Sequence, residues 1–221
     1  MKILIAEDDR ELSQRLYEAI VADGFLADQA RDGEEAHYLG ETGVYDAVLL
    51  DLGLPQRDGL DVLKAWRQAG NKVPVLILTA RGRWSEKREG FNAGADDYLT
   101  KPFNMEEAVI RLRALIRRSS GFAAPLLHCG ALELDSTTSV VKLNGQEILF
   151  TAQEFKIIEF LLHRLDQVVS RLVLIDHVYG TDADPDSNVL DVLIGRIRKK
   201  IGGEFLVTVR GRGYRLRDPT S

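Results

Sequence analysis

Short apolar runs alternate with amphipathic segments along residues 1–118. Continuous apolar runs bounded by turn residues are typical of strands buried on both faces of a parallel sheet. Such strands are predicted at Lys2–Ala6, Phe25–Ala27, Ala47–Leu50, Val73–Leu78 and Tyr98–Thr100. Apolar residues at helical spacing predict helices around Leu12–Ile20, Gly33–Leu39, Leu60–Trp66, Trp84–Ala93 and Met105–Arg118. Five strands alternating with five helices predict an α/β domain with a five-stranded, doubly wound parallel sheet.

The pattern changes after residue 118. The stretch SSGFAA at 119–124 has the composition of a short linker, and residues 125–221 then form a second domain. Short β-like runs follow, with Asn144-Gly145 as a hairpin signal. Thr151 and Glu154 have the spacing of a capping box, which begins the first of three helices. The remaining elements are predicted helices at Leu172–Val178 and Ser187–Ile201 and a terminal hairpin at Phe205–Arg217. Three helices and a hairpin predict a winged helix-turn-helix of the α+β class.

The composition narrows the class of protein. A chain with 45% apolar and 29% charged residues is an ordinary soluble globular one. No apolar run approaches the roughly 18 residues of a membrane span, and acids at 7–9 interrupt the first run too early for a secretory signal. A single cysteine, Cys129, excludes an internal disulfide and any multi-cysteine metal site. We therefore expect a cytoplasmic protein.

Charge is distributed unevenly along the chain. Residues 1–118 carry 17 Lys and Arg against 21 Asp and Glu, a net charge of −4, and residues 119–221 carry 12 against 13, a net charge of −1. Within that second part, Arg196–Arg217 holds eight basic residues and the single acid Glu204, a net charge of +7. An acidic first domain and a basic C-terminal segment indicate two different partners.

Four predicted strands end at residues with chemical use, namely Glu7 and Asp8, Asp51, Thr79 and Lys101. The carboxyl ends of parallel strands meet at one edge of a sheet, so these side chains can come together. Clustered carboxylates suit Mg²⁺, and the Lys101 ammonium suits a phosphoryl group. Each residue alone could be a helix cap or a surface ion pair. Together they indicate Asp51 as a carboxylate nucleophile toward phosphorus, with Mg²⁺ and Lys101 neutralising the transferred charge.

The motifs AEDD, LLDLGLPQRDG, ILTA, GADDY and KPF resemble the receiver domain of two-component response regulators, which has a flavodoxin-like fold. The resemblance covers residues 1–118 and implies that Asp51 is the phosphoacceptor. It implies Mg²⁺ ligands at Glu7, Asp8, Asp51 and the Gly53 backbone carbonyl. It further implies that Thr79 and Lys101 contact the phosphoryl oxygens, that Tyr98 is a rotating switch residue and that the Lys101-Pro102 bond is cis.

The last predicted helix carries the candidate DNA contacts. Apolar residues recur at helical spacing and should face the core, at Leu190, Ile194, Ile197 and Ile201. The residues that then face outward or sideways are Asn188, Asp191, Val192, Arg196 and Lys199. A merely solvated face is the alternative, but the neighbouring helix and hairpin would present this helix to a major groove. An arginine there can read guanine, and Val192 can touch a thymine methyl. Phosphate contacts are expected from Arg198, Lys199 and Lys200, and minor-groove contacts from Arg210 and Arg212.

The motifs TAQEF, VVSR, VYG, SNVLDVLIGRIRKKIG and VTVRGRGYRL resemble the winged-helix output domain of OmpR/PhoB-type regulators. The resemblance implies sequence-specific binding to double-stranded DNA, usually at direct repeats. It also implies a contact between the loop Tyr179–Asp186 and RNA polymerase. A sensor histidine kinase is the implied phosphoryl donor.

The same family resemblance implies a dimer through the fourth helix, fifth strand and fifth helix. The charged residues of this face are Lys87, Asp96, Asp97, Glu107, Arg111 and Arg118. The implied pairs across a two-fold axis are Lys87 with Glu107, Asp97 with Arg111 and Asp96 with Arg118. Exposed pairs are each worth only about 0–1 kcal/mol, but an isologous interface repeats each of them. We expect a homodimer on phosphorylation.

Two alternatives to a phosphorylation-switched transcription factor remain at this level. A phosphatase of the haloacid-dehalogenase type also uses an Asp at a strand end, but it needs a second acid two residues later, where this chain has Gly53. A receiver with a protein-binding output is disfavoured by the basic C-terminal segment. We therefore expect a regulator and not an enzyme.

Overall fold

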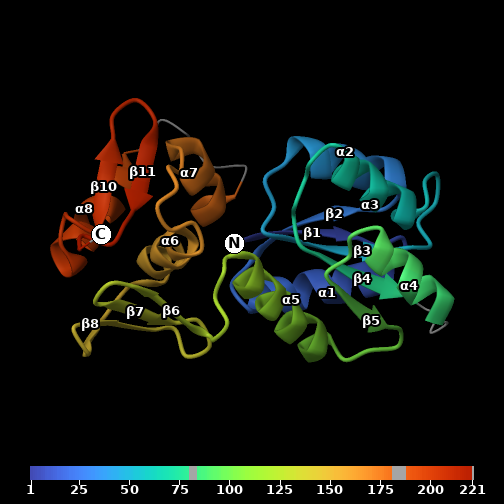
Figure 1. Cartoon of the computed structure of the whole chain (residues 1–221), viewed down its shortest axis with the longest axis horizontal. Coiled ribbons are helices and arrows are strands. Elements are labelled where there is room, and N and C mark those ends of the chain that lie inside the picture. The colour runs from blue at the N-terminus through green and yellow to red at the C-terminus, as the bar shows by residue number, and fades with distance from the viewer. Residues whose placement is uncertain (80–83, 181–187, 221) are drawn as a thin grey trace. The chain divides into compact units, whose positions relative to one another are not determined.

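The computed structural model describes residues 1–79, 84–180 and 188–220, and for residues 84–87 the backbone alone. The chain divides into two compact units, Met1–Ser119 and Ser120–Ser221 (Figure 1). The linker at 119–124 stays a prediction. Three predicted features lie outside the described residues: the start of the predicted helix at Ser187, the Lys87 side chain and the loop positions 181–186. No helix in the described ranges is long and apolar enough to cross a membrane.

The first unit is built on a five-stranded parallel sheet. Its strands are β1 (Lys2–Ala6), β2 (Leu26–Ala30), β3 (Ala47–Asp51), β4 (Val75–Thr79) and β5 (Asp97–Thr100). Its helices are α1 (Arg10–Ala22), α2 (Gly33–Thr42), α3 (Gly59–Gln68), α4 (Trp84–Asn92) and α5 (Met105–Ser119). The strand order is β2-β1-β3-β4-β5, with every pair parallel, which confirms the predicted α/β fold.

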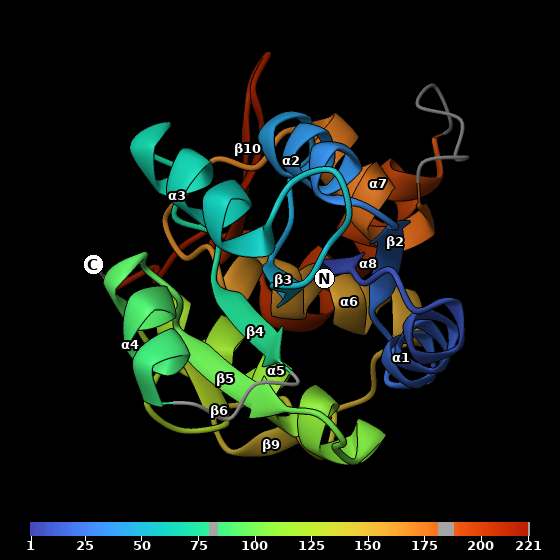
Figure 2. The ribbon, with the colours of Figure 1, turned by 90° about the vertical axis from the view of Figure 1, so that its right-hand side faces the viewer.

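Apolar side chains on both faces hold this sheet between two layers of helices. Every residue of β1, β3 and β4 is buried, as expected for parallel strands covered on both sides. Helices α1 and α5 contact each other, as do α2 and α3, and the two pairs lie on opposite sides of the sheet in Figure 2. The Trp66 side chain of α3 is wholly buried in a core cluster that also contains Leu50 and Val62.

Strand β4 begins two residues later than predicted and ends one residue later, and the second predicted strand differs more. The expected strand Phe25–Ala27 is instead Leu26–Ala30, because the polar residues Asp28 and Gln29 continue the pairing with β1. An edge strand has one open side, so polar residues are tolerated there. Asp28 accepts a hydrogen bond of 2.7 Å from the Tyr45 hydroxyl, which satisfies its carboxylate at the sheet edge. The hydrophobic pattern alone ended this strand too early.

The second unit combines a small sheet, three helices and a hairpin. Its elements are β6 (Leu126–Cys129), β7 (Leu132–Asp135), β8 (Val140–Leu143), β9 (Gln146–Ile148), α6 (Ala152–Leu162), α7 (Arg171–Tyr179), α8 (Val189–Ile201), β10 (Leu206–Val209) and β11 (Gly213–Leu216). Strands β6 to β9 form an antiparallel sheet in sequence order, and β10 pairs with β11. The predicted winged helix-turn-helix is confirmed. Helix α8 begins two residues later than predicted, with Asn188 in the cap position.

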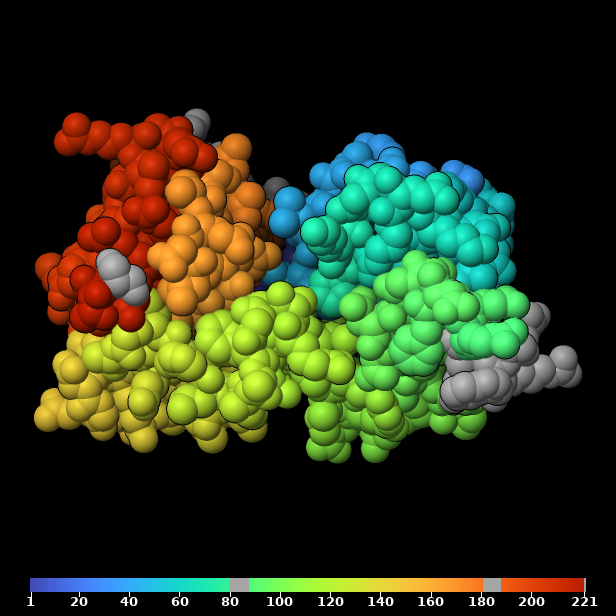
Figure 3. Space-filling view, in the orientation of Figure 1, coloured from blue at the N-terminus to red at the C-terminus, as the bar shows by residue number. Residues whose placement is uncertain are grey.

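Local sequence signals explain the boundaries in this unit. Thr151 and Glu154 form both hydrogen bonds of the capping box at the start of α6, as predicted. Asn144 and Gly145 have φ angles of 52° and 77°, the left-handed pair that a tight two-residue hairpin needs. The tip of the β10–β11 hairpin projects from the surface of its unit (Figure 3). A bridge between Val169 and Tyr214 ties the base of the hairpin to the segment before α7.

Candidate functional site

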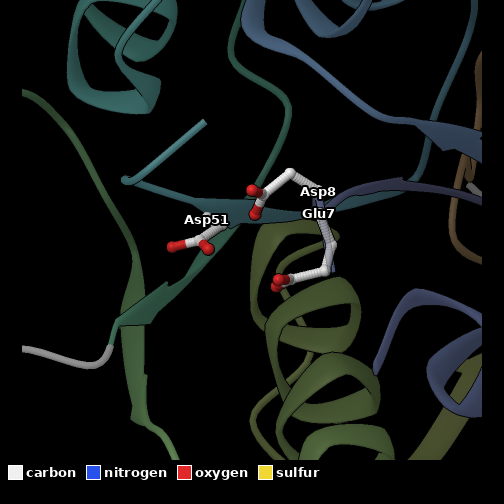
Figure 4. Close-up of side chains that lie close together, drawn as sticks. All are labelled: Glu7, Asp8 and Asp51. Atoms are coloured by element: carbon white, nitrogen blue, oxygen red, sulfur yellow. The ribbon is translucent and has the colours of Figure 1, made fainter. Parts of the chain in front are cut away.

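The predicted acidic pocket lies at the carboxyl edge of the parallel sheet. Glu7 and Asp8 directly follow β1, and Asp51 is the last residue of β3. Their carboxylates converge in Figure 4, each with an oxygen within 4.8 Å of the others. Glu7 is fully buried, Asp51 is buried and Asp8 is exposed. The pocket therefore has one side open to solvent, at Asp8.

Lys101, which follows β5, joins the two buried carboxylates. Its Nζ lies 2.7 Å from Asp51 Oδ2 and donates a hydrogen bond of 2.8 Å to Glu7 Oε1. The second Glu7 oxygen, Oε2, lies 2.7 Å from Nζ but accepts no hydrogen bond within the described residues. The Lys101-Pro102 peptide bond is cis, as the family resemblance implied. The ammonium thus offsets part of the negative charge that the carboxylates concentrate at this site.

Burial and charge shift the pKa values in this pocket. Burial raises the pKa of Glu7 to about 7, and the neighbouring Asp51 carboxylate adds to that rise, whereas the hydrogen bond from Lys101 opposes it. Burial alone would lower the pKa of Lys101, but its hydrogen bonds to Asp51 and Glu7 raise it above the ordinary value. Lys101 is therefore charged at neutral pH, and its hydrogen bond to Glu7 partly offsets the rise that burial causes in the pKa of that carboxyl.

The residues present fit a magnesium ion. Three carboxylates lie close together in a pocket with one open side. Carboxylate oxygens are the hard ligands that Mg²⁺ prefers. The buried Glu7 Oε2 has no hydrogen bond there, so it has a lone pair to offer to a cation. Gly53 donates its backbone N–H to Asp51 Oδ1 over 3.2 Å, which orients the Asp51 carboxylate toward the pocket.

Thr79 and Tyr98 lie on the two strands beside the pocket. Thr79 is the last residue of β4 and is buried, and Tyr98 pairs in register with Ile77, two residues before Thr79. The Tyr98 ring is packed inward against Phe91 of α4, with ring centroids 4.7 Å apart. Its buried hydroxyl has no hydrogen-bond partner among the described residues, a situation that costs roughly 1–3 kcal/mol. Burial raises the pKa of Tyr98 to about 12.

The predicted dimer-face charges have partners within the first unit. Arg111 contacts Asp97 Oδ2 over 3.0 Å and Glu107 Oε1 over 2.8 Å. Asp96 Oδ2 lies 3.2 Å from the Arg67 guanidinium and accepts a 2.8 Å hydrogen bond from the Val75 N–H. The acids expected to pair across a dimer are therefore already engaged inside one chain. Arg67 is a residue that the sequence analysis missed, because its partners come from distant loops.

Helix α8 presents a mixed outer face. Val192 is half exposed, and Arg196 and Lys199 are exposed. Asn188 is exposed and makes no capping hydrogen bond with its side chain. Asn188, Val192, Arg196 and Lys199 therefore remain available to a ligand. Arg210 and Arg212, at the hairpin tip, are exposed as well.

Asp191 has a structural role on the same helix. Its Oδ1 accepts a 2.6 Å hydrogen bond from the Tyr214 hydroxyl, and its Oδ2 lies 2.8 Å from the Arg171 guanidinium. These hydrogen bonds, led by the one from Tyr214, hold the pKa of Asp191 below its ordinary value. Asp191 therefore connects α8 to α7 and to the hairpin. The sequence analysis did not single out Arg171, which entered it only as the last residue of the VVSR motif, just before a predicted helix.

Two of the predicted phosphate contacts also bind inside the unit. Arg198 donates hydrogen bonds to the Leu206 carbonyl and to the Thr208 hydroxyl, which hold the end of α8 against β10. Lys200 Nζ lies 2.6 Å from the buried Glu154 carboxylate and donates to the Leu149 carbonyl. Both side chains brace the fold, so their part in DNA binding stays a prediction.

Comparisons with known proteins agree with this arrangement. A family model for the response regulator receiver domain matches residues 3–113, and one for the C-terminal domain of transcriptional regulatory proteins matches residues 145–216. The chain is 42% identical over 218 residues to the two-component response regulator PhoP of Pseudomonas aeruginosa, covering 97% of both. It is 38% identical over 218 residues to the transcriptional regulatory protein PhoP of Escherichia coli, covering 97% of this chain and 98% of the relative.

A solved structure adds support for the first unit. The receiver domain of the Francisella response regulator 1452 matches with a TM-score of 0.52 and 38% identity, over 53% of this chain and 98% of that one. The two family models place a receiver domain before the C-terminal domain of a transcriptional regulatory protein, and the relatives match over nearly the whole chain. This chain therefore belongs to the two-component response regulators of the OmpR/PhoB type, phosphorylation-dependent transcriptional regulators with a receiver domain and a winged-helix DNA-binding domain.

Proposed function

We propose that Asp51 accepts a phosphoryl group from a sensor histidine kinase and that phosphorylation promotes dimerisation and binding to specific DNA sites in the cytoplasm. The observation that carries the proposal is the Lys101 ammonium, 2.7 Å from Asp51 and at hydrogen-bond distance from Glu7, in a pocket open at Asp8. A buried nucleophile with a fixed cation beside it suits phosphoryl transfer, in which charge is neutralised and little else is required.

The transfer step follows from the positions of these groups. An oxygen of the Asp51 carboxylate attacks phosphorus while the bond from phosphorus to the donor histidine nitrogen breaks. The electron pair of that bond stays with the imidazole, and an acyl phosphate forms on Asp51. Lys101 lies at hydrogen-bond distance from the carboxylate and can follow the charge to the phosphoryl oxygens. The Thr79 hydroxyl, at the end of the next strand, is the proposed second donor to those oxygens.

Mg²⁺ is the proposed cofactor of this step. Glu7, Asp8, Asp51 and the Gly53 carbonyl are the residues that would hold it. When bound, the ion supplies positive charge that offsets repulsion between the carboxylates and the incoming phosphoryl group. Lys101 and the ion then have separate tasks, since the ammonium sits between Glu7 and Asp51 and the exposed Asp8 faces the open side.

The second unit is the proposed DNA reader. Arg196 and Val192 would contact base edges in a major groove, Lys199 would contact phosphates, and the hairpin arginines would enter the adjacent minor groove. A dimer would bind two half-sites, for which direct repeats are the expected arrangement. Contact with RNA polymerase is proposed for the loop after α7, which lies largely outside the described residues.

Substitution of the nucleophile tests the proposal. Asp51→Asn should abolish labelling by acetyl phosphate in Mg²⁺, because an amide oxygen cannot form the acyl phosphate. Asp58→Asn is a matched control, since Asp58 caps α3 nearby in the sequence and should leave labelling intact. Undiminished labelling of Asp51→Asn would contradict the assignment. Sustained multiple turnover of a small phosphomonoester by the unaltered protein would instead favour the phosphatase alternative.

A further inference from the structure

Gly90 of α4 lies directly over the phenol of Tyr98. An ideal Cβ built on Gly90 would overlap the Tyr98 hydroxyl oxygen and would lie 2.6 Å from Cζ and 3.0 Å from Ile77 Cδ1. Gly90 itself is buried, and Tyr98 is 8% exposed. The inward position of the Tyr98 ring therefore occupies space that exists only because residue 90 has no side chain. Figure 2 shows α4 beside β5, which carries Tyr98.

The atoms next to a Cβ at position 90 decide whether a side chain or the backbone would have to move. All three are side-chain ends, and none belongs to the backbone. At Gly59, by contrast, a Cβ would overlap the backbone carbonyl oxygen of Asp51, so the polypeptide itself would have to shift. A methyl group at position 90 can therefore be accommodated by rotation of Tyr98, while α4 keeps its place. The rotation would also release a hydroxyl that has no partner among the described residues.

The alternative position of the ring is the outer face of β5. Strand β5 is the last strand of the sheet, so its far edge is open. Asp97, beside Tyr98, contacts Arg111 of α5, and Arg111 also contacts Glu107 of the same helix. A Tyr98 ring that leaves the space under α4 would lie across this charged surface. The inward ring keeps the surface clear.

We infer that Gly90 is a positioning residue for dimerisation: by leaving room for the inward Tyr98 ring, it keeps the α4–β5–α5 face free to meet a second copy of this chain. The inference deepens the proposed function and rests on phosphorylation-dependent dimerisation. Gly90→Ala should force the ring outward and weaken the dimer, whereas the phosphoacceptor pocket should still be labelled. If the competent fraction of each monomer falls to about one tenth, the dimer dissociation constant rises about 100-fold, because both copies must be competent.

The dimer test compares full-length wild type and Gly90→Ala by sedimentation with Mg²⁺ and beryllofluoride. We expect a dissociation constant at least about tenfold higher for the variant. Two controls should keep the wild-type value: Glu89→Ala, on the exposed side of α4, and Gly40→Ala, which crowds the buried Trp66 ring elsewhere in the same unit. In a Tyr98→Ala background, adding Gly90→Ala should change the dissociation constant less than twofold. A Gly90→Ala effect that persists in that background would overturn the inference.

A second readout separates this inference from the proposed function. The Tyr98 ring resonances, assigned by their loss in Tyr98→Phe, report contact with the Phe91 ring in a tyrosine-labelled sample. They should shift in Gly90→Ala and stay in place in Glu89→Ala. Unchanged resonances would overturn the inference even if dimerisation were altered. A different outcome is a wild type that stays monomeric with beryllofluoride while the Tyr98 ring still moves in Gly90→Ala. That result would overturn the proposed dimerisation, but it would confirm that Gly90 sets the position of the Tyr98 ring.

Discussion

The acidic pocket of Glu7, Asp8 and Asp51 and the outer face of α8 are both charged, but their charges are held in different ways. In the pocket, Glu7 and Asp51 are buried at strand ends, and a single ammonium from Lys101 contacts both. On α8, exposed residues such as Arg196 and Lys199 alternate with Asp191 and Lys200, whose partners lie in other elements of the fold. Burial leaves a charge few possible partners, whereas a surface helix offers many. The function of a charge is therefore easier to assign in the pocket than on the helix.

Removal of Lys101 should have the largest effect, because the pocket has no second cation among the described residues. Lys101→Ala leaves two buried carboxylates uncompensated and removes the donor that would read the phosphoryl group. We expect labelling at Asp51 to persist but the beryllofluoride-driven dimer to be lost. Labelling is measured with acetyl phosphate in Mg²⁺, and dimerisation is measured by sedimentation with beryllofluoride. Lys64→Ala, an exposed lysine of α3, is the matched control and should dimerise normally. Normal dimerisation of Lys101→Ala would show that the buried charge of the pocket is no more essential to the signal than the exposed charges of α8.

A charge reversal on α5 should have the next largest effect. Arg111→Asp places a third acid beside Asp97 and Glu107, and it repels the same acids of a second copy. Labelling at Asp51 should stay, while dimerisation and tight binding to a two-site operator are lost. Adding Asp97→Arg should recover part of both. A fully dimeric Arg111→Asp variant in the ultracentrifuge would show that the signal travels through another face.

Some exposed α8 side chains should make base-specific contacts, and others should contact only the phosphates. Arg196→Ala should cost roughly 1–3 kcal/mol of DNA binding and relax the preference at one base position. Lys199→Ala should weaken binding to all sequences alike and reduce the salt slope by about 1. A set of operator mutants titrated at several salt concentrations distinguishes the two. Identical profiles for both variants would contradict the division.

Lys200 should matter more to stability than to DNA sequence preference. Lys200→Ala leaves the buried Glu154 carboxylate without its cation, at a cost of roughly 1–3 kcal/mol of unfolding free energy. Burial alone would raise the pKa of Glu154, but hydrogen bonds from Lys200 and Thr151 lower it below its ordinary value near 4.5. A lowered folded-state pKa stabilises the protein above pH 4.5, and that contribution is lost as the pH falls further.

Denaturant unfolding at two pH values checks this effect. The difference in unfolding free energy between wild type and Lys200→Ala should be full at pH 7 and should shrink well below pH 4.5, where Glu154 is protonated. Lys199→Ala, exposed on the same helix, should differ little from wild type at either pH. A pH-independent difference would mean that the Lys200 stem, and not its charge, stabilises the unit.

Much of this protein could be predicted from its sequence. Continuous apolar runs such as Ala47–Leu50 predicted parallel strands, and the topology of such sheets alone brings Glu7, Asp51 and Lys101 to one edge. The capping box at Thr151 and the turn at Asn144 depend on neighbouring residues, so they too were correct. Where burial was partial the pattern was less informative, and β2 extends through polar residues that it did not include.

The tertiary structure alone decided which charges face outward and which brace the fold. Helical spacing placed Asp191 and Lys199 on the same outer face, but only the packing of Tyr214 and Arg171 shows that Asp191 is engaged. The space beneath Gly90 is likewise invisible in the sequence, because it depends on where the Tyr98 ring lies. Periodicity reports the direction of a side chain relative to its own helix or strand. The partner that it meets depends on residues brought together from distant parts of the chain, and only the folded structure shows them.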